Sequence, residues 1–170
     1  MPLILPYRTV YPKIDPTCFV AENAVIIGDT TIGPDSSVWY NVAIRGDVND
    51  IKIGARTNIQ DGAVIHVSST TQGTYVGDDV TVGHMALLHA CTVGSRTLIC
   101  MGAIVMDEAV VGDECIIAAG ALVPPRKVIP ARQLWAGSPA KYVRDLTDAD
   151  ILMLKISAEK YVELAHEYRG

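Results

Sequence analysis

The sequence predicts a mainly β fold, a narrow parallel β-helix followed by one C-terminal α-helix, and two patterns predict it. An aliphatic residue returns every six positions through most of the chain. The residue four positions after all but the last of these is small or thin: Ala, Ser, Thr, Cys or Val. One aliphatic and one small inward residue per six describe a triangular coil that three repeats complete. The seventeen repeats, which predict nearly six coils, start at Val20, Ile26, Ile32, Val38, Ile44, Ile53, Ile59, Ile65, Val76, Val82, Leu88, Val93, Ile99, Val105, Val111, Ile117 and Val123.

The repeat is expected to occupy residues 10–125 of a single domain. It stops at Pro124-Pro125, and the proline-containing and glycine-containing segment 126–146 is expected to form an extended connector with turns. Residues 147–169 are predicted to form the helix, because Thr147 and Asp150 make a start similar to a capping box. One helix face is expected to pack along the β-helix or across a subunit boundary, and it carries Leu154, Ala158, Tyr161, Ala165 and Tyr168.

The composition limits which kinds of partner the protein is expected to bind and in which cellular compartment it is expected. The chain has 170 residues with a hydrophobic fraction of 49%, which indicates a folded domain. A net charge of −5 argues against nucleic acid or an anionic membrane as the main partner. No apolar run approaches the length of about 18 residues that a membrane span requires, and no signal peptide is recognisable, so a cytoplasmic location is expected. The four cysteines lack a C-x-x-C spacing and are expected to be buried free thiols.

The repeat register converts sequence positions into spatial columns, since residues three repeats apart stack on neighbouring coils at about 4.8 Å. One such column contains Arg45, His66 and His89, each directly after an inward aliphatic residue. A second column contains Asp61 and His84. His84 and His89 lie on different sides of one coil, so a trimer would be needed to bring three imidazoles together.

Three imidazoles form a ligand set that suits Zn²⁺ or a similar divalent ion and leaves one coordination position open, as in catalytic sites. Against this stands the simpler interpretation that histidines in a β-helix turn are surface or core residues. Arg45 and Asp61 could form an ion pair across the trimer boundary or a purely structural pair. Gln60 is either an amide beside the metal or a turn residue.

The motifs Arg45-Gly46-Asp47, Asn58-Ile59-Gln60-Asp61-Gly62, Gly83-His84 and Leu88-His89, together with His66, resemble the gamma-class carbonic anhydrase family of hexapeptide-repeat proteins. The resemblance spans residues 10–144. It implies a left-handed β-helix and a homotrimer with Zn²⁺, or Fe²⁺ or Co²⁺, at the subunit interfaces. Two of the metal ligands, His66 and His89, would come from one chain, and His84 from its neighbour.

The same resemblance implies reversible hydration of CO₂ to bicarbonate by a hydroxide on the metal. Gln60 would orient that hydroxide, while Arg45, Asp47 and Asp61 would serve trimer ion pairing and site order. Tyr161 would be a helix tyrosine near the metal, although core packing explains it equally well. The loop 68–74 carries no acid, whereas the corresponding loop of the best-known active member carries glutamates for proton transfer. Weak, buffer-dependent or absent activity is therefore expected.

Two other classes of function remain open at this stage. Hexapeptide-repeat proteins include acyltransferases that bind coenzyme A between subunits, so an acyltransferase or a thioesterase acting on acyl-CoA is the main alternative. A metal-stabilised trimer without catalysis, serving as a scaffold, would also keep the histidines. Tight metal binding would argue against the transferase, and coenzyme A binding without metal would argue for it.

Overall fold

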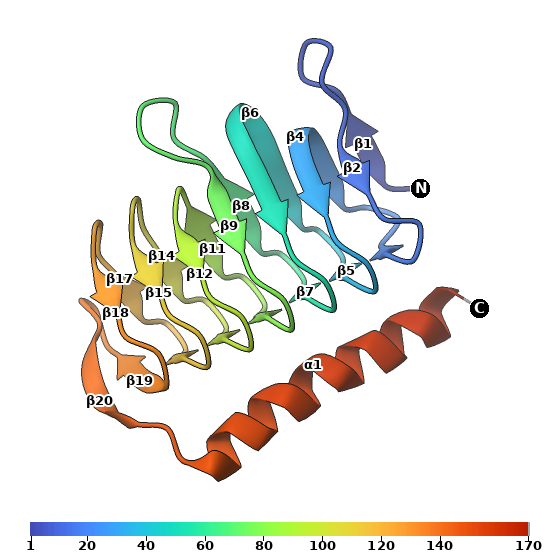
Figure 1. Cartoon of the computed structure of the whole chain (residues 1–170). Coiled ribbons are helices and arrows are strands. Elements are labelled where there is room, and N and C mark those ends of the chain that lie inside the picture. Colours follow the sequence, from blue (N-terminus) through green and yellow to red (C-terminus); the bar gives the residue numbers. More distant parts are fainter. Residues whose placement is uncertain (170) are drawn as a thin grey trace.

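The computed structural model describes residues 1–169, and these form a β-helix with a triangular cross-section and one long α-helix along its side (Figure 1). Each coil contributes one short strand to each of three faces, and every strand pairs in parallel with its counterparts on the next coils, except at the final hairpin. Within the described residues each face has seven parallel strands, so the molecule has about seven coils.

Two long strands bend across a corner and belong to two faces. Face 1 consists of β1 (Leu3–Leu5), the first parts of β4 (Val25–Ile32) and β6 (Ala43–Ile53), β8 (Val64–His66), β11 (Leu87–His89), β14 (Ile104–Val105) and β17 (Leu122–Val123). Face 2 consists of β2 (Lys13–Ile14), the last parts of β4 and β6, β9 (Thr74–Val76), β12 (Thr92–Val93), β15 (Val110–Val111) and β18 (Val128–Ile129). Face 3 consists of β3 (Phe19–Val20), β5 (Ser37–Val38), β7 (Asn58–Ile59), β10 (Thr81–Val82), β13 (Leu98–Ile99), β16 (Ile116–Ile117) and β19 (Gln133–Ala136), and β20 (Lys141–Asp145) adds an antiparallel edge.

The core is the stack of inward repeat residues that the spacing predicts. Ile44, Ile65 and Leu88 are fully buried and lie in register on successive coils. The small residues Ala63 and Ala86 are also fully or almost fully buried, at the turn before each of these strands. The parallel β-helix predicted from the sequence is confirmed, because one large and one small side chain per repeat fill a triangular interior.

The number of coils and the connector were predicted incorrectly. Residues 126–146 contain β18, β19 and β20 in place of an extended connector, and Val128 pairs with Val110. Ile14, Ile129 and Trp135 continue the six-residue spacing at the two ends, so one more coil forms than the nearly six predicted. Pro124-Pro125 does not end the repeat, because it lies in a turn between β17 and β18.

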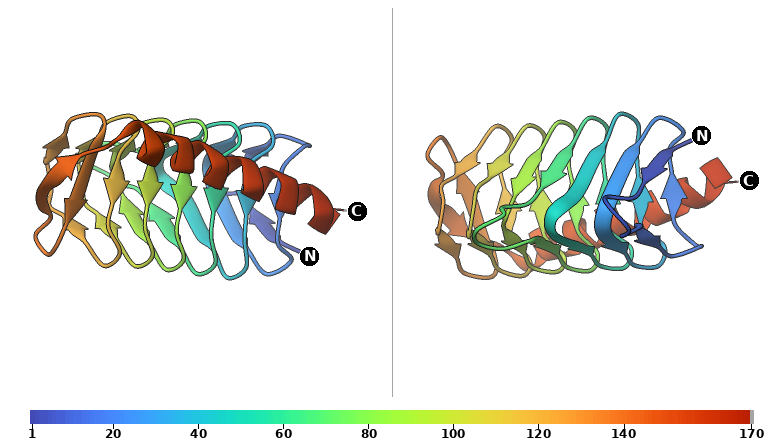
Figure 2. Two further views of the ribbon diagram at one scale, coloured as in Figure 1. Left: turned by 90° about the horizontal axis from the view of Figure 1, so that it is seen from below. Right: turned by 90° about the horizontal axis from the view of Figure 1, so that it is seen from above.

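Helix α1 (Asp148–Arg169) covers part of face 3, and it begins after the predicted cap. The Thr147 hydroxyl accepts the backbone N–H of Asp150, whose carboxylate accepts the N–H of Thr147. The helix runs back along the strands and brings both termini to the same end (Figures 1 and 2). Its predicted apolar face therefore packs along its own β-helix. No helix in residues 1–169 is long and apolar enough to cross a membrane.

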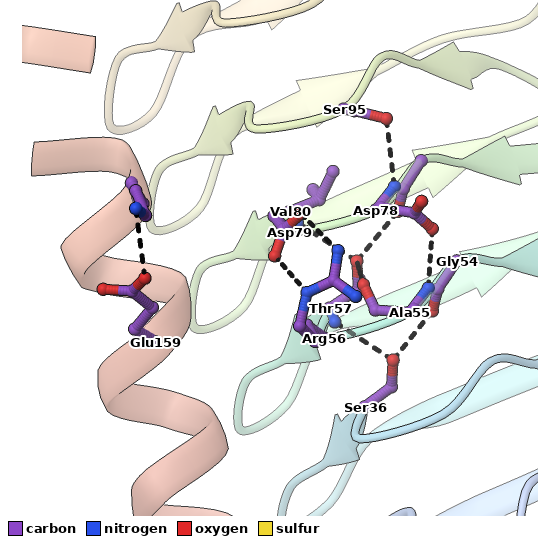
Figure 3. A network of polar contacts seen from close by, with 12 residues as sticks. Ser36, Gly54, Ala55, Arg56, Thr57, Asp78, Asp79, Val80, Ser95 and Glu159 are labelled. Atoms are coloured by element: carbon purple, nitrogen blue, oxygen red, sulfur yellow. Dashed lines mark hydrogen bonds and ion pairs between the residues drawn. The ribbon is translucent and has the colours of Figure 1, made fainter. Parts of the chain in front are cut away.

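One edge of the β-helix, where face 2 turns into face 3, carries a ladder of alternating charge that we call the ladder edge. Its turn residues have left-handed backbone conformations, with φ from 51° to 64°. Arg56 forms two hydrogen bonds of 2.7 Å with Asp79 on the next coil, as Figure 3 shows. Under these charges, the hydroxyls of Ser36 and Thr57 donate to carbonyls of the following coil. The charged series is Asp35, Arg56, Asp79, Arg96, Glu114 and Arg132.

The four cysteines are free thiols, as the sequence predicts, but Cys18 and Cys100 are only half-buried. Cys91 and Cys115 are buried, and burial raises the pKa of Cys91 to about 12. At the ladder edge Cys115 takes the place of a hydroxyl, since its thiol donates to the carbonyl of Pro130 over 3.1 Å. The thiols therefore act as packing groups and weak donors.

Candidate metal centre

Two histidines stack on neighbouring coils at the edge where face 1 turns into face 2, which we call the histidine edge. His66 ends β8 and His89 ends β11, and the two residues are register partners. Arg45 precedes them in the same column, because Ile44 of β6 pairs with Ile65 of β8. The column read from the sequence is therefore present in the structure.

The two imidazoles are held between two carboxylates in a chain of four side chains. Nδ1 of His66 lies 3.2 Å from Nε2 of His89. The other nitrogen of His66, Nε2, is 3.1 Å from Oδ1 of Asp47, and Nδ1 of His89 is 2.7 Å from Oδ1 of Asp107. An ionised carboxylate only accepts hydrogen bonds, so each neutral imidazole places its N–H toward its carboxylate. The lone pairs of the two remaining nitrogens then face each other.

This arrangement fits a divalent metal ion. Two nitrogen ligands at the usual zinc distance in a tetrahedron are about 3.3 Å apart, close to the separation of the facing nitrogens of His66 and His89. Carboxylates behind the ligating imidazoles are the usual outer partners of metal-bound histidine. Without a cation, two facing lone pairs repel each other, and the two carboxylates of Asp47 and Asp107 outnumber the one guanidinium, that of Arg45, which pairs with Asp47. The donor set therefore suits a small cation of N-ligand preference such as Zn²⁺.

Arg45 supports this edge within its own chain. Its guanidinium forms an ion pair with Asp47, which also accepts the backbone N–H of Val48. Burial raises the pKa of Asp47, but the hydrogen bonds from His66 and Arg45 outweigh this effect. The pKa of Asp47 therefore lies below its ordinary value. Within one chain Arg45 is thus paired with Asp47, and the predicted pair of Arg45 with Asp61 would have to form between chains.

The third histidine lies on another edge, where face 3 turns into face 1, which we call the His84 edge. Nδ1 of His84 lies 3.0 Å from Oδ2 of Asp61, one coil away, as their predicted stacking requires. This contact leaves Nε2 of His84 as the free ligand position. In residues 1–169 no three His, Cys, Asp or Glu side chains gather closely enough to hold a metal ion. One chain therefore offers two nitrogen ligands on one edge and one on another.

A hollow of about 300 Å³ lies beside His84, between α1 and face 3. Gln60 and Tyr161 line it together with His84. Gln60 is buried, and its Nε2 donates to Oδ1 of Asn58 over 3.0 Å, which leaves its own carbonyl oxygen as an acceptor. Tyr161 also meets Trp39 edge to face, with 5.6 Å between the ring centroids. Burial and the nearby charge of Asp61 raise the pKa of Tyr161, so it stays protonated at neutral pH.

Face 1, between the two histidine-bearing edges, is apolar on its outer side, and the main contacts of α1 are with face 3. Val64 in its centre is 40% exposed. The outward residues of its strands form one aliphatic stripe, namely Val25, Ala43, Val64, Leu87, Ile104 and Leu122. A continuous apolar stripe of this kind is typical of a protein interface.

The sequence reasoning missed Asp107. It lies in the turn after β14, one coil beyond His89, and Val105 of β14 pairs with Leu88. Continuing the histidine column by one coil would have reached Met106, the neighbour of Asp107. The repeat spacing therefore leads to this turn, but to the residue before Asp107.

Comparison with known proteins identifies relatives of this chain. Residues 90–125 match the family described as bacterial transferase hexapeptide (six repeats). The chain is 42% identical to a carbonic anhydrase of Geobacillus kaustophilus, over 99% of this chain and 92% of the relative. It is 45% identical to the mitochondrial gamma carbonic anhydrase 2 of Arabidopsis thaliana, over 91% of this chain but only 57% of that longer protein.

Among solved structures, a putative acetyltransferase of Bacillus cereus is similar, with a TM-score of 0.96 and 41% identity. The alignment covers 98% of this chain and 96% of that one. The alignment with the Geobacillus kaustophilus carbonic anhydrase covers nearly the whole chain and nearly the whole relative. The chain therefore belongs to the gamma carbonic anhydrase family of hexapeptide-repeat proteins.

Proposed function

We propose that the protein is a carbonic anhydrase that interconverts CO₂ and bicarbonate as a homotrimer, with one divalent metal ion at each subunit interface. His66 and His89 of one subunit and His84 of the next would hold the ion. The observation that carries this proposal is the pair of facing imidazole nitrogens 3.2 Å apart, each imidazole held from behind by a carboxylate. Zn²⁺ is the expected ion, with Fe²⁺ or Co²⁺ as alternatives, and bound Zn²⁺ would lower the pKa of a coordinated water to about 7 and so supply hydroxide at neutral pH.

The apolar face 1 supports the trimer. Burying this stripe against a second copy would remove it from water, and a head-to-tail contact that closes after three copies repeats one interface three times. Because the His84 edge and the histidine edge border face 1 on opposite sides, such a contact can set the His84 edge of one subunit beside the histidine edge of the next. Arg45 and Asp61 would then face each other across the boundary, as the sequence suggested.

The residues around the hollow have distinct expected roles. The carbonyl oxygen of Gln60 would accept a hydrogen bond from the attacking water and fix the direction of its remaining lone pair. Asp61 keeps the proton of His84 on Nδ1, which leaves Nε2 for the metal. Tyr161 offers a neutral hydroxyl beside Gln60, and its raised pKa keeps it a donor rather than a base.

Proton release is the expected weak step. The loop between β8 and β9 contains Ser, Thr, Gln and Gly but no acid. Proton transfer to bulk solvent would then depend on buffer molecules, and turnover should rise with buffer concentration. The four free thiols fit a reducing compartment, and we place the protein in the cytoplasm on that ground.

Acyl transfer or thioester hydrolysis on acyl-CoA is the second candidate, because the similar Bacillus cereus structure is described as a putative acetyltransferase. The two candidates differ in their need for metal. A transferase would bind coenzyme A saturably without a metal ion, whereas the carbonic anhydrase requires the metal.

The first experiment measures metal content and CO₂ hydration of anaerobically purified wild type and His84→Ala. We expect about one ion per wild-type chain with hydration by stopped flow, and loss of both in the variant, since one interface of three ligands exists per chain. Metal without hydration would favour a scaffold or a thioester enzyme. Absence of metal from the wild type would refute the site.

Mixed trimers test the shared site directly. His84→Ala and His89→Ala chains are each expected to be inactive, but refolding them together should restore about a quarter of the interfaces, because some combine an intact His84 with an intact His66 and His89. Mixtures that stay inactive, although trimers form, would mean that the ligands come from one chain. Mixing wild type with His84→Ala gives the matched control for subunit exchange.

A further inference from the structure

We propose that Asp107 is a positioning residue that fixes the tautomer of His89 and thereby the affinity for the metal. This inference rests on the proposed metal site. Its basis is the shortest contact that either imidazole of the histidine edge makes, the 2.7 Å between Oδ1 of Asp107 and Nδ1 of His89. Asp107 lies outside the predicted ligand set and comes from a different coil than His66 and His89.

The backbone holds Asp107 in place from both sides. Its carbonyl oxygen accepts the N–H of Arg126 on the following coil over 2.8 Å. The N–H of the next residue, Glu108, donates to the carbonyl of Ala90 on the preceding coil over 2.6 Å. Asp107 is therefore fixed before any ligand binds, and its carboxylate reaches His89 without ordering a loop.

The position of Asp107 matters because the imidazole of His89 can carry its proton on either ring nitrogen. Neutral histidine carries one N–H, and either nitrogen can hold it. The carboxylate of Asp107 accepts hydrogen bonds only, so it keeps the proton on Nδ1 and the lone pair on Nε2, which faces His66. If the proton moved to Nε2, it would occupy the position where the metal ion has to bind.

The two carboxylates of the histidine edge are not equivalent. Asp47 also forms an ion pair with Arg45 and accepts the N–H of Val48, so its charge is shared among several donors. The charge of Asp107 acts on His89 through the shorter hydrogen bond. Because Arg45 compensates Asp47, Asp107 supplies most of the negative charge that a divalent cation would neutralise.

The test compares Asp107→Asn and Asp107→Glu with Glu108→Gln, a matched control that removes a carboxylate one residue away. Asparagine has the shape of aspartate, but its amide can donate to Nδ1 of His89 and so favour the proton on Nε2. The first readout is the tautomer of His89 in the metal-free protein, measured from the ¹⁵N shifts of its ring nitrogens. Wild type and Glu108→Gln should carry the proton on Nδ1, and Asp107→Asn on Nε2.

The second readout is zinc affinity by competition with a chelator. Asp107→Asn should bind zinc about 10-fold to 100-fold more weakly, Asp107→Glu should recover part of the loss, and Glu108→Gln should match wild type. Circular dichroism and the trimer mass verify that each variant is folded. An unchanged tautomer, or an unchanged affinity in Asp107→Asn, would overturn the proposal, as would a wild type that binds no zinc. A protein that binds zinc and depends on Asp107, yet does not hydrate CO₂, would refute only the proposed activity.

Discussion

The ladder edge and the histidine edge belong to the same β-helix, yet polar side chains of successive coils meet in different ways at the two edges. At the ladder edge a donor on one coil meets an acceptor on the next, as Arg56 meets Asp79. At the histidine edge two acceptors meet, since the facing nitrogens of His66 and His89 both hold lone pairs once their carboxylates fix the protons. A stack with alternating partners stabilises the fold, whereas a stack that repeats one kind of group leaves a position for a ligand.

Hydrogen bonding and burial of the polar side chains also distinguish the ladder edge from the histidine edge. In the described residues no buried side-chain nitrogen or oxygen lacks a hydrogen-bond partner. The hydroxyl column under the ladder edge is therefore complete within one chain. The facing pair of imidazoles is partly exposed, with His66 at 20% and His89 at 31%, so a metal ion and a neighbouring subunit can reach it.

The largest effect should come from removing a ligand at the histidine edge. His89→Ala deletes one of the two facing nitrogens, so we expect the metal content to fall below about 0.1 ion per chain and CO₂ hydration to drop more than about 100-fold. Elemental analysis and stopped flow measure the two effects. Arg96→Met at the ladder edge is the matched control, and loss of metal there would remove the functional difference between the edges.

At the ladder edge the largest effect should concern stability. Thr97 is buried, and its hydroxyl donates to the carbonyl of Gly112 over 3.0 Å and accepts the N–H of Cys115 over 3.2 Å. Thr97→Val keeps the shape but leaves both groups without a partner, so the free energy of unfolding should fall by about 1–3 kcal/mol. Urea denaturation of the metal-free protein measures it. Thr92→Val, on the outer side of β12, should change stability far less, and an equal loss in both would contradict this role of the buried hydroxyl.

The six-residue spacing was enough to predict the fold and the histidine column, because a rigid coil converts spacing into position. His66 and His89 are neighbours in space for that reason alone. The spacing did not predict the last coil, because Pro124-Pro125 has the character of a repeat end. Trp135 completes that coil. Asp107 was missed because it lies one residue out of the column. How two chains meet depends on the shape of whole faces, which no residue spacing encodes.

A smaller effect is expected from the charges of the ladder edge. The Arg56 guanidinium is half exposed, so Arg56→Met should cost at most about 1 kcal/mol despite its two hydrogen bonds to Asp79. The difference from wild type should shrink in 1 M NaCl, because salt screens exposed charges. Denaturation at low and high salt tests this. A loss that does not depend on salt would point to packing of the arginine side chain rather than to its charge.

The smallest effect should come from Asp50, a carboxylate of the β6 excursion that has its own partners, as the ladder residues do. Lys52 and the Tyr75 hydroxyl contact it at 2.8 and 2.9 Å. Burial raises the pKa of Asp50, and these hydrogen bonds outweigh it, so that the pKa is lower in the folded protein. Its contribution to stability is therefore present above the unfolded pKa of about 4 and is lost as the pH falls through the folded value.

Asp50→Asn should accordingly destabilise the protein by less than about 1 kcal/mol at pH 7, and the difference from wild type should narrow at pH 3. Denaturation at the two pH values measures it, and zinc content at pH 7 should equal that of wild type. If zinc binding changed in Asp50→Asn, any carboxylate near the β6 excursion would influence the metal. Unchanged binding would mean that contact with an imidazole, as in Asp47 and Asp107, decides which carboxylates serve the site.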